Sequence, residues 1–263
     1  MDLGVRDRPY LIVGGTGGMG VAAAEVLVAD GARVAVAGRD AGRAREAAET
    51  LGPLAVPVTG DVNGSGGADA LVAAAVEALG GLAGIAITTG TGLEAHSRLA
   101  DATDEIWSEA FDDVLMGTVR TVRAAVPRLV ANGGGTVVTT GAYGMRAYHP
   151  DRLPYVTLKY GVAAFTKTIA REFGPAGVRA NCVCPGAIET SSLAAMRAQL
   201  AEARGVPPEG LLEEVMVEEW HMDVALQRPG TPGEVGDLFA FLLSDRAAYL
   251  TGAIVNIDGG TTF

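Results

Sequence analysis

A tyrosine and a lysine four residues apart, Tyr155 and Lys159, have the types and spacing suited to acid–base chemistry. On a helix, positions i and i+4 lie on the same face, so these two side chains would be neighbours. A lysine ammonium beside a phenol favours the phenolate and lowers a pKa that is ordinarily about 10. Tyr155 is therefore the candidate proton donor or acceptor, with Lys159 as its activator. The pair is common by chance, so its weight depends on the sequence around it.

A glycine-rich segment near the N-terminus has the composition of a phosphate-binding turn. It reads Val13-Gly14-Gly15-Thr16-Gly17-Gly18-Met19-Gly20 and lies between a short apolar run and a helical pattern. Glycines let the backbone turn sharply and approach a pyrophosphate at the N-terminus of the following helix. This segment predicts a dinucleotide-binding site.

The end of the second apolar run bears on which dinucleotide is bound. NAD-selective proteins of this kind usually place a carboxylate there, where it accepts hydrogen bonds from ribose hydroxyls. This sequence has Gly38 and Arg39 instead. A guanidinium pairs well with a 2′-phosphate, which favours NADP(H) over NAD(H). Two alternatives stay open: Arg39 as a solvated surface residue, and Asp40, the expected N-cap of the next helix, reaching a ribose.

The elements that must position these residues alternate along the chain. Short apolar runs between longer helical patterns are typical of a parallel sheet covered by helices. The expected strands are Tyr10–Val13, Arg33–Ala37, Leu54–Val58, Gly84–Thr88, Thr136–Thr140, Val178–Val183 and Ala253–Ile257. The expected helices are Met19–Asp30, Ala41–Leu51, Ala68–Leu79, Asp104–Ala131, Tyr155–Phe173 and Pro232–Leu243. This order predicts an α/β, doubly wound Rossmann fold with about seven parallel strands flanked by helices.

Residues 1–263 are expected to form a single domain, since no low-complexity linker divides the chain. The irregular stretch Ser191–Arg228 carries Pro207 and Pro208 between helical pieces. An insertion beyond the carboxyl end of a late strand is where a substrate lid would sit.

The bulk composition excludes several classes of function. A formal net charge of -11 would repel nucleic acid from most of the surface. No run approaches the roughly 20 apolar residues of a membrane helix. The two cysteines, with no histidine nearby, do not form a zinc-site pattern. We expect a cytoplasmic protein that binds a small-molecule substrate and neither nucleic acid, membrane nor metal.

The motifs that follow the tyrosine and the lysine make their pattern specific. The helix continues as Tyr160–Thr166, and Asn181 and the run Pro185-Gly186-Ala187-Ile188-Glu189-Thr190 come after it. The C-terminal part reads Arg228-Pro229-Gly230 and later Thr251-Gly252 and Asp258-Gly259-Gly260. Over nearly its whole length, the chain resembles the short-chain dehydrogenase/reductase family.

This resemblance implies a nicotinamide-dependent oxidoreductase in which Tyr155 and Lys159 are catalytic. It implies that Asp61 and Val62 meet the adenine and that residues 185–190 hold the nicotinamide amide. The cofactor-binding residues that it implies are Gly14, Thr16, Gly18, Met19, Gly20, Arg39, Asp61, Val62, Gly90, Tyr155, Lys159, Pro185, Gly186, Ile188 and Thr190. It also implies a homodimer or homotetramer.

The sequence departs from the family pattern at two catalytic positions. The serine that normally precedes the tyrosine by thirteen residues is Ala142, and the helix asparagine is Val114. Loss of one oxyanion donor typically costs about 10²–10³ in rate. Candidates for a substitute are Thr140, Tyr143, His149 and Asp113, although each has an ordinary structural explanation.

The leading hypothesis is an NADP(H)-dependent ketoreductase in which Tyr155 donates the proton and Lys159 activates it. A C=N bond is a second possible acceptor, because an oxyanion donor matters less there. The alternative is a catalytically degenerate protein that senses NADP(H) or performs non-redox chemistry, which the loss of the serine and the asparagine favours.

Overall fold

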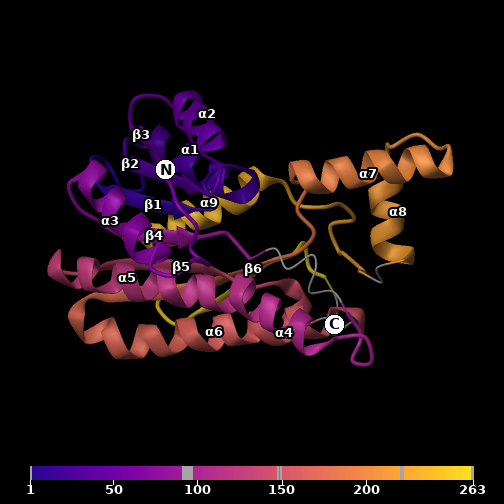
Figure 1. The fold of residues 1–263 in the computed structure, drawn as a ribbon. Coiled ribbons are helices and arrows are strands. Elements are labelled where there is room, and N and C mark those ends of the chain that lie inside the picture. Colours follow the sequence, from indigo (N-terminus) through magenta and orange to yellow (C-terminus); the bar gives the residue numbers. More distant parts are fainter. Residues whose placement is uncertain (1, 91–96, 147, 149, 220–221, 262–263) are drawn as a thin grey trace.

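In the computed structural model, residues 2–90, 97–146, 148, 150–219 and 222–261 are described. Within these residues, seven strands form one fully parallel sheet in the order β3-β2-β1-β4-β5-β6-β7. Helices cover both faces of the sheet (Figure 1). This is the doubly wound α/β arrangement that the sequence predicts.

The expected strands are confirmed to within one or two residues at each end. They run β1 Pro9–Val13, β2 Arg33–Gly38, β3 Ala55–Thr59, β4 Gly84–Ile87, β5 Gly135–Thr140, β6 Val178–Pro185 and β7 Ile254–Ile257. Central strands such as β4 are buried at every position. A strand covered by helices on both faces reads as a continuous apolar run, which is why these segments could be located in the sequence.

The helices also follow the expected order. The first six helical segments are α1 Gly18–Ala29, α2 Ala41–Leu51, α3 Gly67–Leu79, α4 Asp104–Ala110, the π-helix η2 Phe111–Met116 and α5 Gly117–Ala131. The later α-helices are α6 Leu153–Phe173, α7 Ser191–Arg204, α8 Leu211–Glu218 and α9 Pro232–Leu243. No described helix is long and apolar enough to cross a membrane.

One expected element is wrong in detail. The continuous helix predicted over Asp104–Ala131 is interrupted by the π-helical segment Phe111–Met116. A π-helical turn bonds i to i+5 and accommodates an extra residue without changing the apolar pattern of the sequence. Periodicity therefore predicted the helix but not the interruption.

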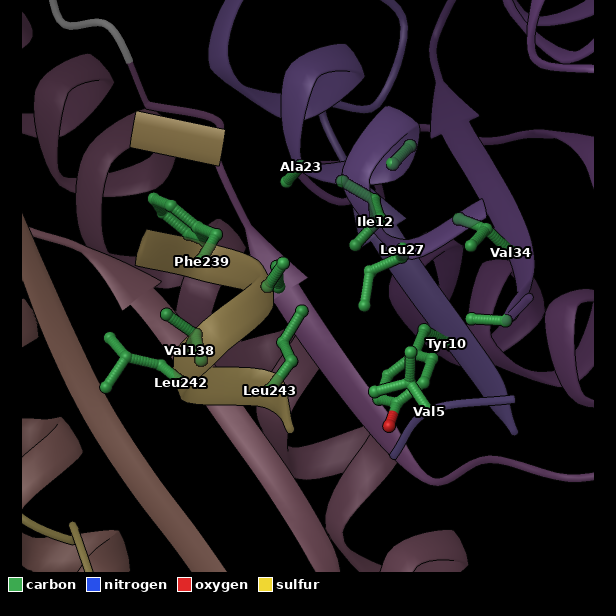
Figure 2. Close-up of a cluster of buried hydrophobic side chains, with 14 of the residues drawn as sticks. Val5, Tyr10, Ile12, Ala23, Leu27, Val34, Val138, Phe239, Leu242 and Leu243 are labelled. Carbon is green, nitrogen blue, oxygen red and sulfur yellow. The ribbon is translucent and has the colours of Figure 1, made fainter. Parts of the chain in front are cut away.

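Two apolar layers stabilise the sheet from opposite sides. One layer packs α1 and α9 on the face that carries Tyr10 and Ile12 of β1, as Figure 2 shows. The other packs α3, α5 and α6 on the face that carries Leu11 and Val13. Successive residues of β1 therefore point to opposite layers.

The stretch 191–228 contains two helices, α7 and α8, which project from one end of the molecule (Figure 1). A small cluster of buried side chains, Leu212, Met216, Met222 and Val224, joins α8 to the segment after it. Partly buried Tyr143 and Ala187 pack against this cluster. We call these four buried residues the lid cluster.

Candidate active site

The candidate residues gather at the carboxyl ends of the parallel strands. Gly14 follows β1, Arg39 follows β2, Gly90 lies beyond β4 and Ala142 lies beyond β5. The strand order reverses between β1 and β4, because β2 pairs with one side of β1 and β4 with the other. Doubly wound folds bind ligands at such a switch point, outside the carboxyl ends of the strands.

The glycine-rich turn forms a concave stretch of backbone in which the side chains of larger residues would collide with neighbouring atoms. Gly14 and Gly18 have φ angles of 86° and 50°, which side chains rarely adopt. A β-carbon at Gly20 would lie 2.2 Å from the carbonyl oxygen of Gly14. Helix α1 begins at Gly18, and its N-cap Gly17 provides no side-chain cap. The turn therefore presents backbone without a side-chain cap at a helix N-terminus, which fits a pyrophosphate.

A second arginine, Arg43, contacts this turn. The side chain of Thr16 lies above Gly38, where a β-carbon would be 2.6 Å from the threonine methyl. The guanidinium of Arg43 donates a hydrogen bond of 3.2 Å to the Thr16 carbonyl oxygen. Arg39 itself is exposed. Sequence reasoning missed Arg43, although its spacing of four residues from Arg39 was a usable signal.

Asp40 is engaged in capping. Its carboxylate accepts hydrogen bonds from the backbone N–H groups of Gly42 and Arg43, at 2.8 and 3.0 Å. These bonds lower the pKa of the Asp40 carboxyl below its usual value. The N-cap role expected from the sequence is confirmed, and it occupies one oxygen of the carboxylate that was considered as a ribose ligand.

The residues expected around the adenine lie beyond β3. Asp61 is exposed and accepts a hydrogen bond of 3.0 Å from the backbone N–H of Asn63, while Val62 is buried. Gly90 has a φ of 83°, and a β-carbon there would lie 3.2 Å from the Cα atom of Val114. The loop after β4 therefore packs tightly against the π-helical segment η2.

The segment from Pro185 to Thr190 passes beside the glycine-rich turn. Gly186 donates a backbone hydrogen bond of 2.9 Å to Ile257, and Ile188 is buried. The hydroxyl of Thr190 caps α7, and its methyl would lie 3.1 Å from a β-carbon at Gly18. Met19, next in α1, is partly buried against the core. The structure thus brings the glycine-rich turn and the 185–190 segment together.

Tyr155 and Lys159 share one face of α6, as the spacing predicts. The ammonium nitrogen of Lys159 lies 5.6 Å from the centroid of the Tyr155 ring. This ammonium is buried and donates a hydrogen bond of 3.0 Å to the carbonyl oxygen of Thr140. Burial lowers the pKa of Lys159 to about 8, even though the nearby thiols and Asp113 oppose that shift.

The expectation that Lys159 lowers the pKa of Tyr155 is not met in this structure. Burial raises the pKa of the Tyr155 phenol well above its ordinary value. Tyr143 raises this pKa further, whereas Arg152 lowers it. Desolvation of the phenol therefore outweighs the effect of the Arg152 charge, and Tyr155 holds its proton at neutral pH.

The two departures from the family pattern lie in apolar surroundings. Ala142 is buried at the end of β5. Val114 is fully buried in a small cluster with Ala110 and Leu158, against which Tyr155 packs. Neither side chain offers a hydrogen-bond donor.

Of the candidate substitutes for serine, two are already engaged and one is undescribed. The hydroxyl of Thr140 donates to the carbonyl oxygen of Ile87 at 2.7 Å. Asp113 accepts a hydrogen bond of 3.4 Å from the side chain of Asn63. His149 lies outside the described residues.

Tyr143 is the remaining candidate, and it has a partner that sequence reasoning missed. The guanidinium of Arg152 donates a hydrogen bond to the Tyr143 hydroxyl oxygen. The central carbon of this guanidinium lies 5.6 Å from the centroid of the Tyr143 ring. Arg152 immediately precedes α6, three residues before Tyr155, and its sequence position alone gave no signal of this contact.

Comparison with known proteins identifies the family. A protein-family sequence model described as enoyl-(acyl carrier protein) reductase matches residues 14–262. Dehydrogenase/reductase SDR family member 4 from Homo sapiens is 32% identical over 260 residues, covering 98% of this chain and 88% of its own length. Trans-4-hydroxycyclohexanecarboxylate dehydrogenase from Sinomonas cyclohexanicum is 30% identical over 267 residues, covering 98% of this chain and 94% of its own length.

A solved structure agrees with these relatives. L-sorbose reductase from Gluconobacter frateurii, in complex with NADPH and L-sorbose, superposes with a TM-score of 0.91 at 30% identity. The match covers 99% of this chain and 98% of that one. The chain therefore belongs to the short-chain dehydrogenase/reductase family, whose members are oxidoreductases that use nicotinamide cofactors. The resemblance drawn from the motifs is confirmed.

Proposed function

We propose that this protein reduces a carbonyl group of a small organic molecule, with NADPH as the hydride source and Tyr155 as the proton donor. The observation that carries the proposal is the position of Tyr155, whose ring centroid lies 5.6 Å from the buried ammonium of Lys159. A phenol whose pKa is raised by burial holds a proton, and a reductase needs a proton to deliver.

The preference for NADPH rests on the charges beside the glycine-rich turn. Arg39 follows β2, and Arg43 reaches the Thr16 carbonyl from the first turn of α2. Two guanidinium groups on this side of the turn favour a 2′-phosphate. The NADPH in the complex of L-sorbose reductase supports the same choice.

The residues proposed to hold the cofactor divide into three groups. Backbone at Gly14–Gly20 would hold the pyrophosphate, Asp61, Val62 and Gly90 would surround the adenine and its ribose, and Pro185–Thr190 would hold the nicotinamide amide. When bound, the cofactor supplies the hydride. Lys159 would position the nicotinamide ribose while its ammonium remains tied to the Thr140 carbonyl.

Tyr155 performs the protein's part of the reaction. As negative charge develops on the carbonyl oxygen of the substrate, the phenol of Tyr155 transfers its proton to that oxygen. The positive charge of Lys159 stabilises the phenolate left behind. Because the phenolate forms only as the proton leaves, Lys159 stabilises the transition state and not the resting enzyme. This accounts for a high pKa of Tyr155 before the reaction and for the retained lysine.

The decisive experiment follows the oxidation of NADPH and NADH by absorbance, with ketoses such as L-sorbose, 4-ketocyclohexanecarboxylate, a β-ketoacyl thioester and a cyclic imine as acceptors. We expect turnover with a carbonyl and NADPH, and a loss of at least about 10²-fold in Tyr155→Phe. Turnover that persists in Tyr155→Phe would contradict the proposed role of the phenol. Reduction of the imine alone would move the proposal to C=N bonds.

The buried methyl group of Ala142 favours one alternative, a protein that binds NADPH without reducing anything. Tight NADPH binding with no turnover for any acceptor, unchanged in Tyr155→Phe, would support that alternative. The retained Tyr155 and Lys159 favour the enzyme, because a sensor has no use for a proton donor.

We further propose that residues 191–228 act as a substrate lid and that the protein forms a homodimer or homotetramer. The lid proposal is supported by the packing of Tyr143 against the lid cluster. A cavity of about 140 Å³ lies between Ile188 and the lid residues Met216 and Val224. Deletion of residues 191–218 should raise the KM for the substrate far more than the Kd for NADPH.

A further inference from the structure

The candidate active site lacks the hydrogen-bond donor that the family pattern places at position 142. Ala142 stands where a hydroxyl is expected, and the neighbouring threonines are committed elsewhere. Thr139 shares a hydrogen bond of 2.7 Å with Thr166, and Thr140 donates to the Ile87 carbonyl. A substitute donor therefore has to come from another residue.

Tyr143 stands one residue beyond Ala142 and is connected to the catalytic helix. It begins the 3-10 turn Tyr143–Met145 that follows β5, and Arg152 precedes α6. The hydrogen bond between Arg152 and the Tyr143 hydroxyl therefore joins the two ends of the loop that carries the site. The central carbon of the guanidinium lies 5.6 Å from the centroid of the tyrosine ring, and the hydrogen bond from Arg152 holds the phenol in position.

The position of Tyr143 places it between the proton donor and the lid. Tyr143 packs against the lid cluster. The turn that Tyr143 begins packs against α6, because a β-carbon at Gly144 would lie 3.2 Å from the side chain of Val156, the residue after Tyr155. A substrate between Tyr155 and the lid would thus meet both phenols.

The direction of the Arg152 hydrogen bond determines what Tyr143 can do. An arginine can only donate, so the Tyr143 oxygen is the acceptor and its own proton is left for another oxygen. A phenol that accepts from a cation becomes a stronger donor, because the two hydrogen bonds polarise one another. This is the property required of a group that stabilises a developing alkoxide.

We propose that Tyr143, held and polarised by Arg152, replaces the missing serine hydroxyl as the second hydrogen-bond donor to the substrate oxygen. The assignment rests on the proposed carbonyl reduction. In that reaction, hydride adds to the carbonyl carbon, the C=O π electrons move to oxygen, and Tyr155 transfers the proton. Tyr143 donates a hydrogen bond and transfers nothing, so it is a catalytic residue and Arg152 is its positioning residue.

The first test is Tyr143→Phe, which removes one oxygen and keeps the packing against the lid. With the best carbonyl acceptor from the panel above, we expect kcat to fall about 10²–10³-fold, with the Kd for NADPH unchanged by nicotinamide fluorescence. Tyr160→Phe, an exposed tyrosine on α6, is the matched control and should keep the kcat of the unmodified enzyme. A wild-type kcat in Tyr143→Phe would overturn the assignment.

A rescue experiment separates catalysis from structure. Ala142→Ser in the Tyr143→Phe background restores a hydroxyl at the adjacent position, and we expect it to recover at least about tenfold in kcat. A purely structural tyrosine would not be replaced by a serine hydroxyl, so no recovery would contradict the assignment.

Arg152→Met tests the positioning role. It should lower kcat with little effect on the Kd for NADPH, and it should have little further effect in the Tyr143→Phe background, because both changes act on the one hydrogen bond that Tyr143 donates. Additive effects of the two substitutions would overturn the role of Arg152.

The unmodified enzyme and Tyr155→Phe separate this assignment from the proposed function. If Tyr155→Phe is inactive while Tyr143→Phe keeps its kcat, only the assignment of Tyr143 fails. If the unmodified protein reduces no carbonyl, both fail.

Discussion

At the scale of single residues, the buried ammonium of Lys159 predicts an alkaline limit to activity. Burial lowers its pKa to about 8, so the group is charged below that pH and loses its charge above it. The phenol of Tyr155 titrates higher and does not account for such a limit. We expect kcat/KM for the carbonyl acceptor to fall about tenfold per pH unit above about 8.

Lys159→Arg provides the control for this pH dependence, since arginine remains protonated throughout the range. In that variant, whatever activity is retained should persist to higher pH. A profile of the unmodified enzyme that stays flat to pH 10 would contradict the assignment of the limit to Lys159.

Arg43 carries a prediction about cofactor selectivity. Its guanidinium already reaches the glycine-rich turn through the Thr16 carbonyl. Arg43→Ala should weaken NADPH binding about tenfold or more, equivalent to about 1.4 kcal/mol, and leave NADH binding unchanged. Arg45→Ala, an exposed arginine in the same helix, should change neither Kd. Equal losses for both cofactors in Arg43→Ala would indicate a structural role, and fluorescence titration of the two cofactors measures the difference.

The sequence predicted the residues whose roles are set by local patterns and missed those set by long-range contacts. Tyr155 and Lys159 share a face because helical spacing requires it, and Asp40 caps α2 because short-range bonds favour it. The contact of Arg152 with Tyr143 joins two residues nine positions apart that lie in different 3-10 turns. The pKa of Tyr155 depends on burial by segments that are distant in sequence, and no local pattern contains that information.

At the scale of elements, the close contact between α1 and α9 explains why one position of α9 is a glycine. In α9, a β-carbon at Gly236 would lie 2.6 Å from the backbone of Ala22 in α1, whereas one at Gly233 would have no neighbour nearer than 3.8 Å. Gly236→Ala should therefore lower the free energy of unfolding by about 1–3 kcal/mol.

Gly233→Ala is the matched control in the same helix, and it should be neutral or stabilising by up to about 1 kcal/mol. Urea denaturation of both variants measures the difference. Equal stabilities would show that α1 can shift away from α9 at little cost.

The interrupted helix shows that apolar spacing predicts the extent of a helix but not a π-helical segment within it. Apolar spacing predicted helix over Asp104–Ala131 correctly at both ends. The π-helical segment within it is stabilised by contacts from elsewhere, because Asn63 donates to Asp113 and Gly90 packs against Val114. Those contacts come from the loops after β3 and β4, which the helical pattern does not contain.

At the scale of the whole molecule, the two apolar layers predict one cooperative unit. The α1–α9 layer contains residues from Leu3 to Ala247, and the opposite layer contains residues from Leu11 to Ala180. Both layers share every central strand. We expect a single unfolding transition in urea, coincident by far-UV circular dichroism and by tryptophan fluorescence. Two separated transitions would contradict the single domain proposed for residues 1–263.

The packing of α1 against α9 also constrains how the protein is made. Helix α1 ends at Ala29, and its partner α9 begins at Pro232, so one side of α1 and one face of β4 and β5 stay partly uncovered until synthesis has passed Pro232. Domains emerge from the ribosome N-terminus first, and exposed apolar surface on a nascent chain promotes aggregation. The growing chain is therefore vulnerable until α9 is available, and a truncated product that lacks α9 should be a substrate for chaperones and proteases rather than a smaller folded protein.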